Sequence, residues 1–471
     1  MTILHYILIA LEVVLIFNLI IGVHELGHFL AARWRGLKVE RFAIWFGKPI
    51  WKKKIGGVEY ALGTIPFGGY VSLPQMATME AIEGKSDNTE PLPNVAPLDK
   101  IIVAFAGPLF SFLLAFAFAG LVWSVGKPTN SSDSTTQIGY VEPTGPAAKA
   151  GLKAGDTILE IDGFPVHHFA PTSADSVQWR IVTSTGTNLS IKYLRDGKEG
   201  MAYAVPYHRP TKWYERKDLR HLQISSADKA IVYDIASNSP AARAGLKPWD
   251  EIIALNGEKI YSSMAIDSAE DAMSNGVVKP LVMTVKRGDK QFDCTVVAVR
   301  PLQPTNDMPR LGILAMVGDT NITLTYPSPG EQIKTSALQI FNTLGALFSK
   351  KGEIGVQQLG GAVMIGRVYY NLLQDDQGWR RVLWFSVILN VNLALLNMLP
   401  LPVLDGGHIT LSLIEAIRRR PVNARIVEKI QTMFAALLIF FMVYIAFFDT
   451  GDWIRSARAD RDVPVVFAPQ K

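Results

Sequence analysis

Four long apolar segments divide this chain of 471 residues. They cover about residues 3–32, 101–126, 382–404 and 430–448, and the second and third contain no charged residue. A helix needs about 20 mostly apolar residues to cross a bilayer, and each segment meets that length. The pattern therefore predicts a multi-pass α-helical membrane protein with four transmembrane helices.

Three shorter patterns between these spans predict further structure. Residues 38–75 alternate aromatic and β-branched residues with glycines, which predicts short β-hairpins with glycine turns close to the membrane. A sheet at that depth must be buried in protein or line a wet cavity, because lipid cannot pair with free backbone groups. Residues 76–97 are expected to form a loose cytoplasmic loop. At 330–350 apolar residues share one helical stripe, which predicts an amphipathic helix on the membrane surface or packed on the protein.

An internal repeat lies between the second and third spans. The stretch at 145–163 returns without a gap at 239–257, and both copies share Pro-Ala-Ala-x-Ala-Gly-Leu-Lys. This pattern resembles PDZ domains, which bind extended peptides by adding a strand to a sheet edge. The alternative is a pair of spacers without a ligand. We expect two tandem PDZ-like α/β domains, at 127–210 and 215–305.

Basic residues predict which side of the membrane each segment faces. They cluster after the first span and between the third and fourth: Arg33, Arg35, Lys38, Arg41, Lys48, Lys52, Lys53 and Lys54, then Arg418, Arg419, Arg420, Arg425 and Lys429. The positive-inside rule makes both clusters cytoplasmic. The PDZ-like domains and both termini then lie outside the cytoplasm, which in a bacterium means the periplasm.

Composition agrees with this organisation and narrows the possible partners. A first membrane half at 1–126 and a second at 381–471 would be joined through the PDZ-like domains and a linker with amphipathic helices at 306–380. The chain is 49% hydrophobic, too apolar for an ordinary soluble enzyme. Its net charge of +5 is small and its basic clusters adjoin apolar segments, so no nucleic acid partner is expected. The single cysteine, Cys294, excludes an intrachain disulfide and a cysteine-based zinc site.

The first span contains the motif His24-Glu25-Leu26-Gly27-His28, a match to H-E-x-x-H. Residues four apart share a helix face, so the two imidazoles can bind one Zn2+. Glu25 points to a neighbouring face, where it can take a proton from the attacking water. Since His24 precedes Arg33 by about 13 Å of helix, the motif lies inside the membrane near one face. Ionisable residues at that depth are costly and usually functional, which disfavours a chance match on a surface helix.

A third ligand must come from elsewhere, because a catalytic zinc site holds three protein ligands and one open position. The longer H-E-x-x-H-x-x-G-x-x-H pattern needs a histidine at position 34, where this chain has Trp34. The third span runs opposite to the first and brings Asp405, in the sequence Asp-Gly-Gly-His, to the cytoplasmic end where His24 and His28 lie. Two alternatives remain: Asp405 could serve only to form a turn, or His408 could be the third ligand instead. We favour Asp405.

Together these motifs resemble the site-2 protease family of intramembrane zinc metalloproteases. HELGH at 24–28, FAGP at 105–108, the two PDZ-like copies and NMLPLPVLDGGH at 397–408 occur in the order typical of that family. The resemblance implies one Zn2+ per chain, bound by His24, His28 and Asp405, with Glu25 as the general base.

The resemblance also implies a substrate site. Asn392, Asn397 and Pro402 would hold an unwound substrate strand near the metal. Gly68 and Gly69, within PFGGYV, would belong to a membrane-re-entrant β-loop that pairs with substrate. The chain departs from the family pattern at Ser111, where relatives often carry asparagine.

The expected function is that of an endoprotease that cuts transmembrane segments of single-pass membrane proteins in regulated intramembrane proteolysis. By resemblance, the substrates are membrane-anchored anti-sigma factors already trimmed outside, and signal peptide remnants. The lipid bilayer of the bacterial inner membrane is a further partner, and the PDZ-like domains would bind peptides or trimmed substrate termini.

The alternative is an inactive, zinc-stabilised scaffold that recruits partners through these domains. Glu25 argues against it, because a scaffold needs metal ligands but no base. A transporter is less favoured, because the spans show no repeat.

Overall fold

The computed structural model describes residues 3–76, 95–170, 173–273, 277–304, 308–349, 352–420, 422–459 and 465–469. The loop predicted at 76–97 lies almost entirely outside these residues. The chain forms two compact units. The membrane unit comprises Met1–Lys127, Thr325–Ile340 and Leu359–Thr450, and the β unit comprises Pro128–Leu324, Phe341–Gln358 and Gly451–Lys471.

Within the described residues, four helices of the membrane unit are long and apolar enough to cross a bilayer, as the sequence predicts. They are α1 (Ile3–Trp34), α3 (Pro97–Val125), α11 (Gly378–Asn397) and α13 (Ala424–Ala459), of which the last continues into the β unit. The third helix ends at Asn397, earlier than the predicted end at 404. Pro400 and Pro402 cannot continue a helix, and a new helix, α12 (Asp405–Arg418), begins at Asp405 itself.

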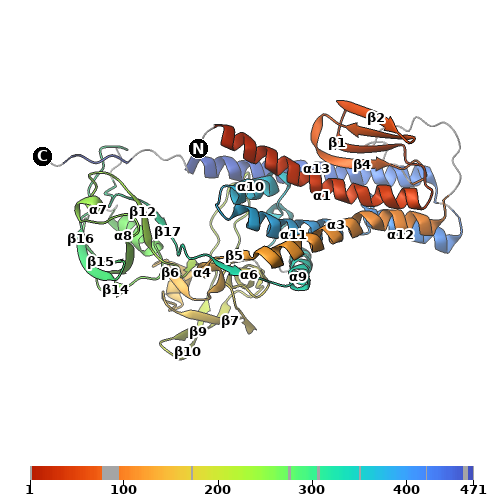
Figure 1. The fold of residues 1–471 in the computed structure, drawn as a ribbon. Helices are drawn as coiled ribbons and strands as arrows, with labels where there is room; N and C mark the ends of the chain where they lie inside the picture. Colours follow the sequence, from red (N-terminus) through yellow and green to blue (C-terminus); the bar gives the residue numbers. More distant parts are fainter. Residues whose placement is uncertain are drawn as a thin grey trace. The chain divides into compact units, whose positions relative to one another are not determined.

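Helix α3 packs against both α1 and α11 (Figure 1). Small residues allow these close contacts. Against α1, a Cβ added at Gly27 would lie 2.4 Å from the carbonyl oxygen of Ala106, so only glycine allows this approach. Against α11, Ala115 and Ala119 are fully buried beside Val387. These contacts hold the H-E-x-x-H helix directly against α3.

A four-stranded sheet follows α1 and lies beside it (Figure 1). Its strands are β1 (Arg41–Phe46), β2 (Trp51–Ile55), β3 (Val58–Leu62) and β4 (Ile65–Ser72), in the order β2-β3-β1-β4. The β2–β3 hairpin turns at Gly56 and Gly57, as expected. However, β1 pairs with β3 in parallel and with β4 in antiparallel fashion, so the sheet is more than a series of hairpins. Its edge strand β4 contacts α1.

The β unit contains two similar domains. The first has β6 (Ile138–Val141), α5 (Pro146–Lys149), β7 (Thr157–Ile161), β8 (Phe164–Pro165), α6 (Val177–Thr183), β9 (Leu189–Arg195), β10 (Lys198–Ala204) and β11 (Ile224–Ser226). The second has β12 (Ile231–Ile235), α7 (Pro240–Arg243), β13 (Glu251–Leu255), β14 (Glu258–Lys259), α8 (Met264–Ala272), β15 (Leu281–Arg287), β16 (Lys290–Val296) and β17 (Ile313–Val317). Two further strands, β5 (Lys127–Thr129) and β18 (Thr323–Thr325), pair with each other.

Buried ion pairs show that the two copies of the repeat fold alike. In the first, Arg195 Nε donates to the Asp156 carboxylate over 2.6 Å, and in the second Arg287 does the same to Asp250. Asp156 and Asp250 are 1% and 0% exposed, so each carboxylate is neutralised inside its domain. The repeat seen in the sequence is therefore also a structural repeat.

Each domain is closed by a strand that lies beyond its predicted end. β11 pairs with β6, so the first domain extends to Ser226 and past 210. β17 pairs with β12, so the second extends to Val317 and past 305. The repeated motif does not include these strands, which is why it could not reveal them. The amphipathic helix predicted at 330–350 is present as α9 (Pro329–Leu347).

Candidate metal centre

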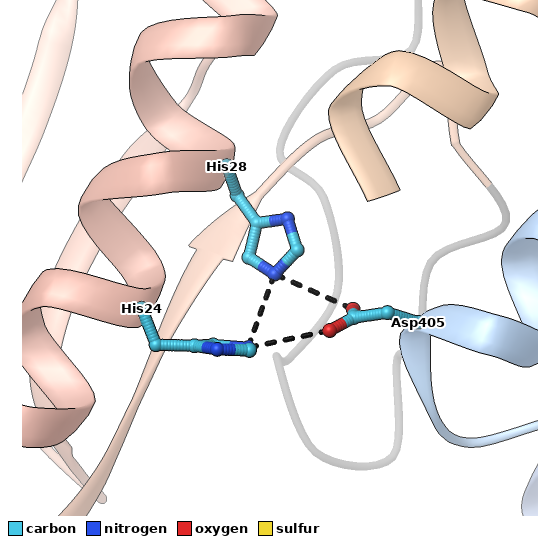
Figure 2. Close-up of side chains that lie close together, drawn as sticks. All are labelled: His24, His28 and Asp405. Carbon is cyan, nitrogen blue, oxygen red and sulfur yellow. Dashed lines mark hydrogen bonds and ion pairs between the residues drawn. The ribbon is translucent and has the colours of Figure 1, made fainter. Parts of the chain in front are cut away.

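Three side chains from distant parts of the sequence meet within the membrane unit. His24 and His28 lie one turn apart on α1, and Asp405 is the first residue of α12 (Figure 2). The Nε2 atom of His24 lies 3.3 Å from Asp405 Oδ2, and Nε2 of His28 lies 3.3 Å from Oδ1. The two Nε2 atoms are 3.3 Å apart. Among the described residues this is the one group of three or more His, Cys, Asp or Glu side chains spaced to hold a metal ion.

Both imidazoles are oriented by hydrogen bonds to α3. Nδ1 of His28 donates to the carbonyl oxygen of Val103 over 2.8 Å. A neutral imidazole carries one proton, so Nε2 of His28 keeps its lone pair free. Nδ1 of His24 lies 2.9 Å from Ser111 Oγ. In each case Nδ1 contacts the protein and Nε2 faces the other side chains of the cluster, an arrangement typical of metal-binding histidines.

The donor atoms fit a tetrahedral zinc ion. Bonds of about 2.0–2.1 Å from the centre of a tetrahedron place its corners about 3.3 Å apart. The measured spacing of the three donors matches that value. In addition, the buried Oδ2 atom of Asp405 accepts no hydrogen bond within the described residues, which is costly unless a cation lies beside it. Two histidines and a carboxylate also leave one position open, as a catalytic site requires.

A cavity of about 340 Å³ adjoins the three donor atoms. Glu25 lines it together with the edge strand β4, and a Cβ added at Gly69 would lie 3.3 Å from Glu25 Cγ. The cavity is lined by Ile21, His24, Glu25, His28, Phe46, Gly68, Gly69, Tyr70, Val71, Leu73, Met76, Ala104, Leu393, Asn397, Val403, Leu404, Asp405 and His408. It therefore offers an acid–base group, a strand edge and the donor atoms to one ligand.

The other residues singled out from the sequence lie at varying distances from this cavity. Gly68, Gly69 and Asn397 line it, and so does His408, which is not part of the three-residue cluster. Asn392 lies on α11 but does not line the cavity. The carbonyl oxygen of Pro402 accepts a hydrogen bond from Gln431 Nε2 over 3.3 Å.

Sequence reasoning missed the contribution of α3. Ser111 appeared only as a departure from the family pattern, and Val103 was not considered. Gly107 comes so close that an added Cβ would lie 2.1 Å from His28 Nε2, so any side chain would displace that nitrogen. The small residues of the FAGP stretch at 105–108 could have indicated from the sequence that α3 approaches α1 closely.

Comparisons with known proteins place these features in one family. The family model described as Peptidase family M50 matches residues 12–441. A Vibrio cholerae protein that carries a provisional zinc metalloprotease name is 28% identical over 462 residues, covering 92% of this chain and 96% of that protein. A Haemophilus influenzae protein named regulator of sigma E protease is 27% identical over 444 residues, with 91% and 96% covered. A Yersinia pestis protein named protease RseP is 25% identical over 455 residues, with 90% and 94% covered.

Proposed function

Since this chain belongs to peptidase family M50, the site-2 protease family of zinc metalloproteases, we propose that it cuts the transmembrane segments of single-pass proteins in the bacterial inner membrane. The observation that carries this proposal is the meeting of His24, His28 and Asp405 next to Glu25 in one cavity. These residues come from an apolar helix and from the segment that follows another, so the chemistry lies among membrane helices.

Each residue of the site has a separate role in this proposal. His24, His28 and Asp405 would hold one Zn2+ per chain, and the bound ion would supply the Lewis acidity that makes water nucleophilic at neutral pH. Glu25 takes the proton from the attacking water and passes it to the leaving nitrogen. Ser111 and the carbonyl of Val103 keep both imidazoles in the orientation that presents Nε2.

Strand β4 supplies the surface on which the substrate is held. Ser72 O accepts from the N–H of Glu40, so Ser72 and, by alternation, Tyr70 turn their main-chain groups toward β1. Gly69 and Val71 then turn theirs away from the sheet, beside Glu25. A helical peptide bond is shielded by its own hydrogen bonds, and an unwound substrate could pair with these outward-facing main-chain groups. Asn397 lines the same cavity and, with Asn392 and Pro402, would position the strand from the other side.

The two domains of the β unit are proposed to be PDZ-like domains on the periplasmic side, with both termini on that side and the active site near the cytoplasmic side. The basic residues around the end of α1 and around the start of α13 support this orientation. In this position the domains would exclude substrates with large periplasmic parts and admit trimmed ones, such as anti-sigma factors after a first cut. They could also bind the trimmed termini.

Incubation of the purified protein with a tagged transmembrane peptide tests the proposal. Cleavage within the apolar segment is expected, together with its loss after treatment with a zinc chelator and its return when Zn2+ is added. A zinc-loaded protein that leaves a range of transmembrane peptides intact would instead favour a zinc-stabilised scaffold.

A further inference from the structure

The C-terminal residues 465–469 lie against the second domain of the β unit and pair with it through the main chain. The N–H of Val466 donates to the carbonyl oxygen of Gln303 over 2.9 Å, and the N–H of Leu302 donates back to Val466 over 2.7 Å. Arg243 Nη2 donates to the carbonyl oxygen of Ala468 over 3.1 Å. These bonds use only backbone groups of the tail, as in the binding of an extended peptide.

One side chain of the tail is inserted into the domain. Phe467 is 2% exposed, whereas its neighbour Val466 is 43% exposed. Gly312 forms the floor under the aromatic ring: an added Cβ would lie 2.9 Å from Phe467 Cε2 and 2.2 Å from Ser239 Cβ. The φ angle of Gly312 is +85°, a conformation that glycine adopts without strain. The tail thus presents one aromatic residue beside Gly312, which has no side chain, and next to Ser239.

The first domain has a different residue at the position equivalent to Gly312. β11 and β17 occupy equivalent positions, since Ile224 pairs with Val141 and Ile313 pairs with Ile235, the residue 94 positions after Val141. Gln223 is therefore the counterpart of Gly312, and it also has a positive φ of 56°.

The residue equivalent to Ser239 in the first domain is Gly145. There, Gln223 Oε1 comes within 3.0 Å of the position that a Cβ on Gly145 would take. The first domain therefore has a glutamine side chain of its own at this place, and the second domain has glycine and takes Phe467 from the tail. Because this difference falls within a repeat whose other features agree, the pocket is a specific property of the second domain.

We propose that Gly312, Ser239 and the main chain at 302–303 form a binding site for an extended peptide with an aromatic side chain, and that the chain's own tail is its resident occupant. The tail follows the end of α13 in the sequence. A partner segment of the same chemistry must displace the tail in order to bind. The proposal is independent of the protease activity.

Disulfide trapping in the full-length protein tests the resident contact. Gln303→Cys and Val466→Cys are introduced with Cys294→Ala. Directly paired antiparallel residues have Cα atoms about 5.5 Å apart, within the range of a disulfide. Mild oxidation should cross-link most molecules, measured as loss of thiol labelling.

The role of Phe467 is tested in the same protein. Addition of Phe467→Glu should lower the rate of disulfide formation about tenfold or more. The control combines Val466→Cys with Tyr233→Cys, an exposed position in the same domain. Equal trapping in the control pair, or no effect of Phe467→Glu, would overturn the resident contact.

Peptide binding tests the ligand class. A labelled peptide of residues 461–471 is added to the intact protein and to a form that ends at 459. A linked tail competes at a high effective concentration, so the shortened protein should bind the peptide at least about tenfold more tightly. A peptide with Phe467→Glu should lose binding, while its matched control, Val466→Glu, should retain it.

A double variant distinguishes peptide binding at Gly312 and Ser239 from non-specific binding to the domain. Ser239→Gly with Gly312→Gln imports both residues of the first domain, where the same backbone is already compatible with them. The shortened protein with these changes should keep its melting temperature to within a few degrees and lose peptide binding. If it binds as well as before, or if the shortened protein binds neither peptide, no such site exists.

Discussion

Nδ1 of His24 lies 2.9 Å from the hydroxyl oxygen of Ser111, although 87 residues separate them in the sequence. The two residues are 7% and 0% exposed, so no water competes for this contact. It fixes the rotation of the imidazole and leaves Nε2 facing His28 and Asp405. Helix α3 therefore acts as the support of the proposed metal site.

Replacement of Ser111 by alanine should weaken zinc binding without removing a ligand. The loss of one such supporting hydrogen bond typically lowers metal affinity about 10–100-fold. Titration with a competing chelator would measure this, and excess zinc should restore most of the activity. Ser124→Ala, an exposed serine on the same helix, serves as the control. Unchanged affinity in the Ser111 variant would mean that His24 holds its orientation without the hydroxyl.

Glu25→Gln should abolish cleavage while zinc stays bound, because the amide cannot accept the proton of the attacking water. Loss of a general base costs about 10²–10⁴-fold in rate. Metal analysis of the purified variant and a peptide cleavage assay measure the two effects separately. A variant that cuts at a substantial fraction of the normal rate would remove Glu25 from the proposed role.

Asp405→Ala should reduce zinc occupancy and activity together, since it removes one of three donors. His408→Ala is the matched comparison, because His408 lines the same cavity but lies outside the three-residue cluster. It should retain the metal. The reverse result, with full occupancy in the Asp405 variant and loss in the His408 variant, would reassign the third ligand.

Gly69→Pro should slow the cutting of every helical substrate, because proline removes an outward N–H donor of β4. A hydrogen bond worth about 1 kcal/mol corresponds to roughly a fivefold to tenfold effect. Gly69→Ala keeps the N–H and adds a Cβ that would lie 3.1 Å from Ala43 O, so it controls for crowding. Equal rates for the two variants, at equal zinc content, would exclude strand pairing at Gly69.

Local patterns in the sequence were sufficient for the elements that depend on neighbouring residues. The four apolar helices, the amphipathic helix at 330–350 and the Gly56–Gly57 turn follow from composition and spacing alone. Asp405 was within reach because the direction of successive spans limits which residues can meet His24. The H-E-x-x-H motif indicates a zinc site, and such a site needs a third side chain that can bind the metal.

Features that depend on long-range pairing could not be predicted in this way. The parallel pairing of β1 with β3 joins strands whose sequences carry no mark of partner or direction. The closing strands β11 and β17 lie outside the repeated motif. Ser111 was uninformative as a residue type, since only the packing of α3 against α1 shows that its hydroxyl faces His24.

Removal of residues 128–324 tests the proposed gate, and we expect the shortened protein to cut full-length substrates as well as trimmed ones. The cut ends are close, because Thr325 Oγ1 donates to the carbonyl oxygen of Lys127 over 3.3 Å, so a short flexible linker can replace the domains. The three donor atoms and the cavity all belong to the membrane unit and should remain. Rates on a full-length substrate and on its trimmed form are compared at equal zinc content.

The two possible roles of the domains lead to opposite results in this comparison. If they act as a gate, the full-length substrate becomes cleavable and the trimmed one stays so, since the repulsive element has been removed. If they recruit substrate, cleavage of the trimmed form falls, because its binding energy is lost although the chemistry is intact. A zinc-loaded deletion variant that no longer cuts the trimmed substrate would therefore reject the gate and establish the domains as the recruiting part.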